Sequence, residues 1–107
     1  QTKSKFFDID FTDGTIHIQV LKSVQEFYEE GQAMHHCVFS NEYYTKPDSL
    51  ILSARINNQR IETIEISLKT MEIIQSRGAC NKDTEFHHTI IKLVRKNMKA
   101  IRKRLVA

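Results

Sequence analysis

The first twenty residues show the alternation of apolar and polar positions that is typical of β-strands. In residues 7–11 every second residue is apolar, and residues 15–20 show the same alternation. Side chains on a strand point alternately to the two faces of a sheet, so a period of two predicts strands. Asp13 and Gly14 lie between the two runs and favour a tight turn, because glycine adopts positive φ angles at little cost. We therefore expect a β-hairpin over residues 5–20.

A short helix is predicted after the hairpin. Ser23 and Glu26 have the spacing of a capping box, in which the serine hydroxyl accepts a free backbone N–H of the first turn. Gly31 is suited to end the helix in the left-handed conformation. We expect a helix over residues 23–30. The following residues, 32–38, fit either a second helical turn or a loop.

Three further strands are predicted in the middle of the chain. Residues 49–56, 60–68 and 71–77 each alternate between aliphatic and polar side chains. The links between them, residues 57–59 and 69–70, are too short for a parallel crossover. The three strands therefore form an antiparallel meander.

The C-terminal part of the chain has the apolar spacing of one helix face. The pattern predicts a helix over residues 84–105, capped by Asp83 or Thr84, whose apolar positions are Phe86, Ile90, Val94, Ile101 and Leu105. The expected order of elements is β-β-α-β-β-β-α. This order predicts an α+β fold with an antiparallel sheet of about five strands. We expect the two helices, the long basic one C-terminal, to pack on one face of the sheet.

The composition is that of one globular domain. The chain has 107 residues, of which 40% are hydrophobic and 27% charged. Domains usually contain ~100–200 residues, so we expect a single domain over residues 1–107. The first residue is Gln1 rather than methionine, so we expect this domain to be a piece of a longer chain. No apolar run approaches the ~20 residues of a membrane span, and no membrane partner is expected. Cys37 and Cys80 match no zinc or disulfide pattern, so we expect free thiols, no metal and no cofactor.

Charge is distributed unevenly along the chain. Residues 92–107 carry seven basic and no acidic side chains, whereas the preceding residues carry nine basic and thirteen acidic ones. Most charged helix faces are only solvated, but a cationic stripe without acids favours an acidic partner such as nucleic acid. The predicted nucleic-acid contacts are Lys92, Arg95, Lys96, Lys99, Arg102 and Lys103.

His35, His36 and Cys37 form the first candidate for catalysis. A thiolate nucleophile needs a base or a positive neighbour, which a histidine supplies. Adjacent side chains on a helix diverge by ~100°, however, which argues against His36 as the base for Cys37. The alternative interpretation is that Cys37 is a core residue and one histidine is merely exposed. His87 and His88 fit no metal-ligand spacing and are interpreted as helix-surface residues.

The polar face of the meander is the second candidate. Arg55, Glu65, Gln75 and Arg77 alternate with aliphatic residues on adjacent predicted strands. Such a cluster can grip a phosphate or a polar substrate. It is also typical of a solvated sheet face stabilised by cross-strand pairs such as Arg55 with Glu65.

The loop after the last predicted strand is a third, weaker candidate. Gly78 permits a sharp turn there, and free N–H groups at the start of the next helix suit an anion. Asn81 is equally suited to be a turn residue, a cap or a ligand.

Three blocks together resemble the PcfJ-like proteins of bacterial plasmids and other mobile elements, over roughly residues 21–105. The first block begins at Gly31, continues through the Met-His-His-Cys-Val run 34–38 and ends at Tyr43 or Tyr44. The others are the Thr-Ile-Glu-Ile strand 63–66 and the Gln-x-Arg-Gly-x-x-Asn run 75–81.

The resemblance implies a bacterial cytoplasmic protein tied to mobile DNA, an accessory of the DNA-processing complex in conjugative plasmid transfer. It supplies no tested active site. It does imply that several polar residues belong to one cluster: His36, Cys37, Glu65, Gln75, Arg77 and Asn81.

Three functions remain open from the sequence. The first is a nucleic-acid-binding module, with DNA favoured, that contacts phosphates through the basic helix and works beside other proteins of a DNA-transfer complex. The second is a small hydrolase or transferase with Cys37 as nucleophile and His36 as base. In that enzyme Glu65 would assist catalysis. A second set of residues would bind the substrate or a partner: Arg55, Gln75, Arg77, Gly78 and Asn81. The third is a protein-binding module of a longer chain.

Overall fold

The chain folds around one five-stranded antiparallel sheet. The computed structural model describes residues 3–35 and 46–107. The strands lie in the order β1-β2-β3-β4-β5, so each pairs with its neighbour in the sequence. Their bounds are β1 (Asp10–Thr12), β2 (His17–Val20), β3 (Ser49–Ile56), β4 (Gln59–Ser67) and β5 (Glu72–Arg77). The predicted α+β fold and antiparallel meander are confirmed.

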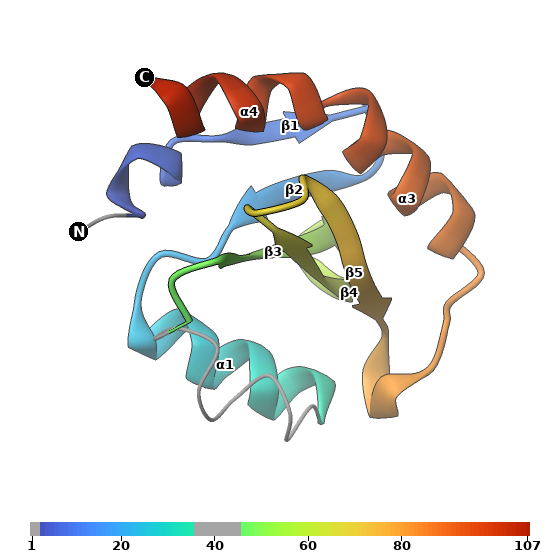
Figure 1. Cartoon of the computed structure of the whole chain (residues 1–107). Coiled ribbons are helices and arrows are strands. Elements are labelled where there is room, and N and C mark those ends of the chain that lie inside the picture. The colour runs from blue at the N-terminus through green and yellow to red at the C-terminus, as the bar shows by residue number, and fades with distance from the viewer. Residues whose placement is uncertain (1–2, 36–45) are drawn as a thin grey trace.

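Helices cover both faces of this sheet (Figure 1). Helix α1 lies against one face, and α3 with α4 lies against the other. The helical elements are η1 (Ser4–Phe6), α1 (Val24–Met34), η3 (Ala79–Asn81), α3 (His87–Lys96) and α4 (Met98–Val106). The expectation of two helices on one face is therefore wrong. None of the helices in the described ranges is long and apolar enough to cross a membrane.

Alternation along the central strands explains why two layers of helix are needed. Leu52 on β3 faces Ile64 on β4, and both join the main core beneath α3 and α4. The next pair, Ser53 and Thr63, points to the opposite face and is also fully buried. Polar residues on this second face are covered by α1 rather than by water, which the alternation alone did not reveal.

The N-terminal segment corrects the predicted hairpin. Strand β1 begins at Asp10, and the preceding residues form the short 3-10 helix η1 instead of a strand. Phe6 and Ile9, three residues apart, are both buried in the main core, and η1 packs against α4. The turn itself is as predicted, because Gly14 has a φ of 100° and Asp13 Oδ1 accepts the backbone N–H groups of Thr15 and Ile16.

Helix α1 begins as predicted and ends later. The Ser23 hydroxyl accepts the N–H of Glu26 at 3.1 Å, and the Glu26 carboxylate accepts the N–H of Lys22 at 2.9 Å. Gly31 does not end the helix: it lies inside α1, buried on the side that faces the sheet. His35 closes the helix instead, with a left-handed φ of 57° and its N–H bonded to the Gly31 carbonyl.

The predicted C-terminal helix is divided in two. It starts at His87 rather than at residue 84, and α3 and α4 meet at Asn97, whose φ of −104° and ψ of 6° are not helical. The Asn97 side-chain amide donates to the Leu93 carbonyl at 2.9 Å, which also accepts the Asn97 backbone N–H at 3.3 Å, so this residue closes the end of α3. The break lets α3 pack on β5 while α4 turns to cover η1.

Candidate functional site

A buried carboxylate, Glu30 of α1, organises the polar face of the sheet. Only 1% of its surface is exposed. It accepts hydrogen bonds from Ser53 Oγ at 2.9 Å, Thr63 Oγ1 at 2.5 Å and Arg60 Nε at 2.8 Å. Arg55 lies 3.8 Å away. Glu30 thus neutralises two arginines and ties α1 to β3 and β4.

The expected ion pair between Arg55 and Glu65 is absent from the described structure. Strand register explains this: Glu65 lies opposite Ile51, whereas Arg55 lies opposite Arg60 at the far end of β3. Arg55 therefore faces Glu30, a residue that the sequence interpretation missed. The signal for Glu30 was its position three residues after Phe27 on the buried stripe of α1.

Glu65 forms a second polar cluster with Gln75. The Gln75 amide donates to Glu65 Oε1 at 2.8 Å, and Ser49 Oγ donates to Oε2 at 2.7 Å. These two residues of the predicted site therefore lie together, and Glu65 is 2% exposed. Burial lowers the pKa of the nearby Lys3 ammonium, an effect opposed by attraction to Asp48 and Glu65.

The loop after β5 has a steric reason for its glycine. A Cβ at Gly78 would lie 2.4 Å from Thr84 Cγ2 and 2.8 Å from the Lys82 carbonyl oxygen. Cys80 and Asn81 follow with left-handed φ angles of 59° and 63°. The loop packs beside α1, while Arg77 turns outward and forms an ion pair with Asp83 at 3.3 Å.

Two predicted catalytic residues, His36 and Cys37, lie outside the described residues, as do Tyr43 and Tyr44. Their relation to Glu65 therefore stays a prediction. Cys80 is an exposed free thiol. Within residues 3–35 and 46–107, no group of three His, Cys, Asp or Glu side chains is placed to hold a metal ion.

A third buried carboxylate, Glu62 on β4, lies on the opposite face and was also missed. Ser76 Oγ donates to its Oε1 at 2.7 Å, and the N–H and hydroxyl of Thr84 donate to its Oε2 at 2.9 and 2.7 Å. His87 Nδ1 lies 2.8 Å from Oε1. The sequence signal was a glutamate in phase with the buried Ile64.

The basic side chains of α3 and α4 form an exposed surface. Its six members are the predicted nucleic-acid contacts: Lys92, Arg95, Lys96, Lys99, Arg102 and Lys103. In the part of the chain that the structure describes, none of the six forms an ion pair. The seventh cation, Arg104, instead bonds to Asp8 and to the Lys5 carbonyl, and so fastens α4 to the N-terminal segment.

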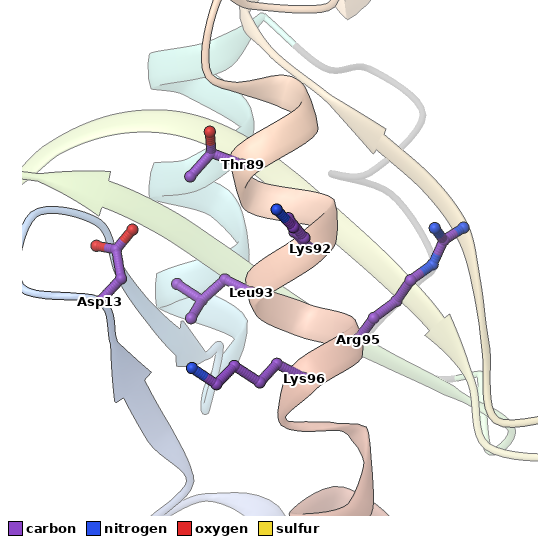
Figure 2. Close-up of a pocket in the computed structure, with 6 residues that line it drawn as sticks. All are labelled: Asp13, Thr89, Lys92, Leu93, Arg95 and Lys96. Carbon is purple, nitrogen blue, oxygen red and sulfur yellow. The ribbon is translucent and has the colours of Figure 1, made fainter.

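A groove borders this surface between α3 and the β1–β2 turn (Figure 2). It encloses about 570 Å³. Lys96 and Leu93 extend from α3 toward Asp13, which forms the acidic wall of the groove. The backbone N–H groups of Ile16 and Thr15 hold the pKa of the Asp13 carboxyl below its usual range, so this wall stays negatively charged at neutral pH. This negative charge makes the Asp13 side of the groove unfavourable to an anion.

Comparison with known proteins gives one match. The family model described as PcfJ-like protein matches residues 1–91. No curated protein and no solved structure matches the chain. The matched segment contains the three buried glutamates and the polar sheet face, whereas the six cations of the α3–α4 surface lie beyond it.

Proposed function

The chain belongs to the PcfJ-like protein family, and we propose that it is a nucleic-acid-binding module whose α3–α4 surface contacts phosphates. The observation that supports this function is the exposed set of six cations without an ion-pair partner in the described residues. Cations that are already paired gain little from a new anion, whereas unpaired ones are free to replace the counterions of a phosphate backbone.

The bend at Asn97 supports the same function. It turns α4 away from the axis of α3, so the cations are carried by two helical segments of different direction (Figure 1). No recognition helix is implied, because contacts to phosphates position a protein without reading bases. We propose binding that depends weakly on sequence, with DNA as the favoured partner.

We also propose a wider role for this module, on the basis of the resemblance to proteins of mobile elements. The proposed setting is an accessory role in DNA processing or transfer by a bacterial mobile element, in the cytoplasm, together with other proteins of the transfer complex. The basic surface lies outside the segment that the family model matches, so nucleic-acid binding is a proposal about this chain's own residues.

Fluorescence anisotropy with labelled single- and double-stranded DNA tests the proposal. Each phosphate contact contributes about 0.9 to the slope of log affinity against log salt for duplex DNA. The triple variant K96A/K99A/R102A should therefore reduce the slope by about 2 to 3 and weaken binding at low salt.

The matched control is K22A/K69A/K82A, which removes three exposed lysines outside α3 and α4. Both variants have the same net charge, so a loss caused by charge alone affects them equally. Equal binding by the two variants, or no binding by the wild-type protein at low salt, would contradict the proposed function.

A further inference from the structure

A second groove lies on the other side of α3, where the helix faces the edge strand β5. It encloses about 360 Å³ and is lined by side chains of both elements. Figure 2 shows Arg95 extending to this side, away from Asp13 and Lys96. The groove therefore collects side chains that can carry positive charge: Arg77, His87, His88 and Arg95.

Glu62, which lies in the protein interior beneath the groove, fixes the orientation of the His87 ring. Glu62 is fully buried and already accepts three hydrogen bonds, from Ser76 and Thr84. An ionised carboxylate can only accept, so His87 Nδ1 carries the proton of their 2.8 Å contact. The other ring nitrogen, Nε2, is left to bind a ligand, and it donates a hydrogen bond to an anion when the ring carries a proton on both nitrogens. A carboxylate that holds one histidine nitrogen fixes the orientation of the ring, as it does for metal-binding histidines.

Arg77 supplies the second feature of a ligand site. Its side chain is 44% exposed and bonds to Asp83, whose side chain is 57% exposed and lies 3.8 Å from His87 Nδ1. Exposed ion pairs of this kind are weak, so an incoming anion can replace Asp83 at Arg77. Arginine presents a planar fork of N–H groups that matches a phosphate at two oxygens.

Arg77 and His87 lie close together because both contact Asp83, at 3.3 and 3.8 Å. We propose that the β5–α3 groove binds one phosphate group at this end, held by Arg77 and by a hydrogen bond from His87 Nε2–H. The groove shares only Arg95 with the α3–α4 surface, and its other basic side chains lie inside the segment that the family model matches. Phosphate binding here is thus independent of nucleic-acid binding by α4. The phosphate belongs either to a nucleic-acid strand or to a free nucleotide.

Titration with inorganic phosphate at constant ionic strength, followed by NMR of the histidine ring signals, tests the site. The His87 and His88 signals should shift saturably with phosphate and not with sodium chloride. Variant R77Q should weaken phosphate binding about tenfold, because a charge-assisted hydrogen bond is lost. Variant D83N should tighten it, because the competing carboxylate is removed. The control K69Q, which removes one exposed charge on the β4–β5 turn, should bind phosphate as the wild type does.

These comparisons are made between variants whose backbone amide spectra show that they are folded like the wild type. Shifts that do not saturate, or equal affinity in R77Q and K69Q, overturn the proposal, as does weaker binding by D83N. If a short oligonucleotide displaces phosphate, the natural ligand is a phosphate of a nucleic-acid strand. If only a nucleoside monophosphate displaces it, the natural ligand is a free nucleotide. If neither displaces phosphate, the groove is not a site for phosphate esters and the proposal fails. The K96A/K99A/R102A variant should retain phosphate binding even if it loses DNA.

Discussion

Replacing Glu30 with alanine tests whether a buried carboxylate holds α1 to the sheet. In the wild type, Glu30 accepts from Ser53 and Thr63 and neutralises Arg55 and Arg60. Alanine removes all of these contacts at once. It leaves two hydroxyls and two guanidinium groups beneath the helix without their shared acceptor.

The magnitude follows from the burial of the partners. Removing one member of a buried ion pair typically costs about 3–5 kcal/mol. The arginine side chains retain 17% and 23% exposure, so water solvates part of their charge and the lower end applies. We expect E30A to lower the free energy of unfolding by about 3 kcal/mol, a large part of the 5–15 kcal/mol that is usual for a domain. For a domain of this size the melting temperature should fall by about 12 °C or more.

Urea unfolding followed by circular dichroism measures this loss. The matched control is E29A, because Glu29 is the preceding residue on the same helix but is 49% exposed and lies 3.9 Å from Arg60. A surface pair of this kind contributes about 0–1 kcal/mol. The variant E30Q keeps one acceptor oxygen and should lie between the two. If E30A and E29A unfold at the same urea concentration, the network does not stabilise the fold and the reasoning is refuted.

Other outcomes test further parts of the structure. Variant G78A should lower the free energy of unfolding by about 1–3 kcal/mol, because the new Cβ overlaps Thr84 and the Lys82 carbonyl; an unchanged urea midpoint would contradict this. The Arg104 side chain holds the pKa of the Asp8 carboxyl below its usual range, so their contact stabilises the fold at neutral pH and is lost as pH falls through that lowered pKa. D8N should therefore melt below the wild type at pH 7 and together with it in strong acid, whereas an equal difference at both pH values would show that charge is not involved. The salt slope of K96A/K99A/R102A remains the direct test of nucleic-acid binding.

The candidate site was predictable only where partners are close along the chain. Gln75 and Glu65 lie on strands joined by a short turn, so alternation placed them on one face, and they share a hydrogen bond. Glu62 and His87 are far apart in the sequence and meet because α3 folds back over the sheet. Neither spacing nor composition could reveal that pair.

The local pattern of the chain determined its strands and turns. Residues 49–56 form β3 as the alternation predicts, and the following turn has left-handed Asn57 and Asn58. A short link with residues that tolerate positive φ leaves no other pairing than an antiparallel one. The Ser23 cap is equally local, since it needs only a hydroxyl and a backbone N–H three residues later.

Only the tertiary structure decided which face each helix covers. The polar face of the meander resembles a solvated surface until Glu30 is placed against Ser53 and Thr63. The break at Asn97 has the same kind of cause, because a helix that continued straight past β5 could not also cover η1. The sequence by itself determined the pairing of the strands and the cap of α1, through interactions between near neighbours. Their arrangement in layers depends on buried polar groups finding distant partners, since an unpartnered charge beneath a helix would cost several kcal/mol.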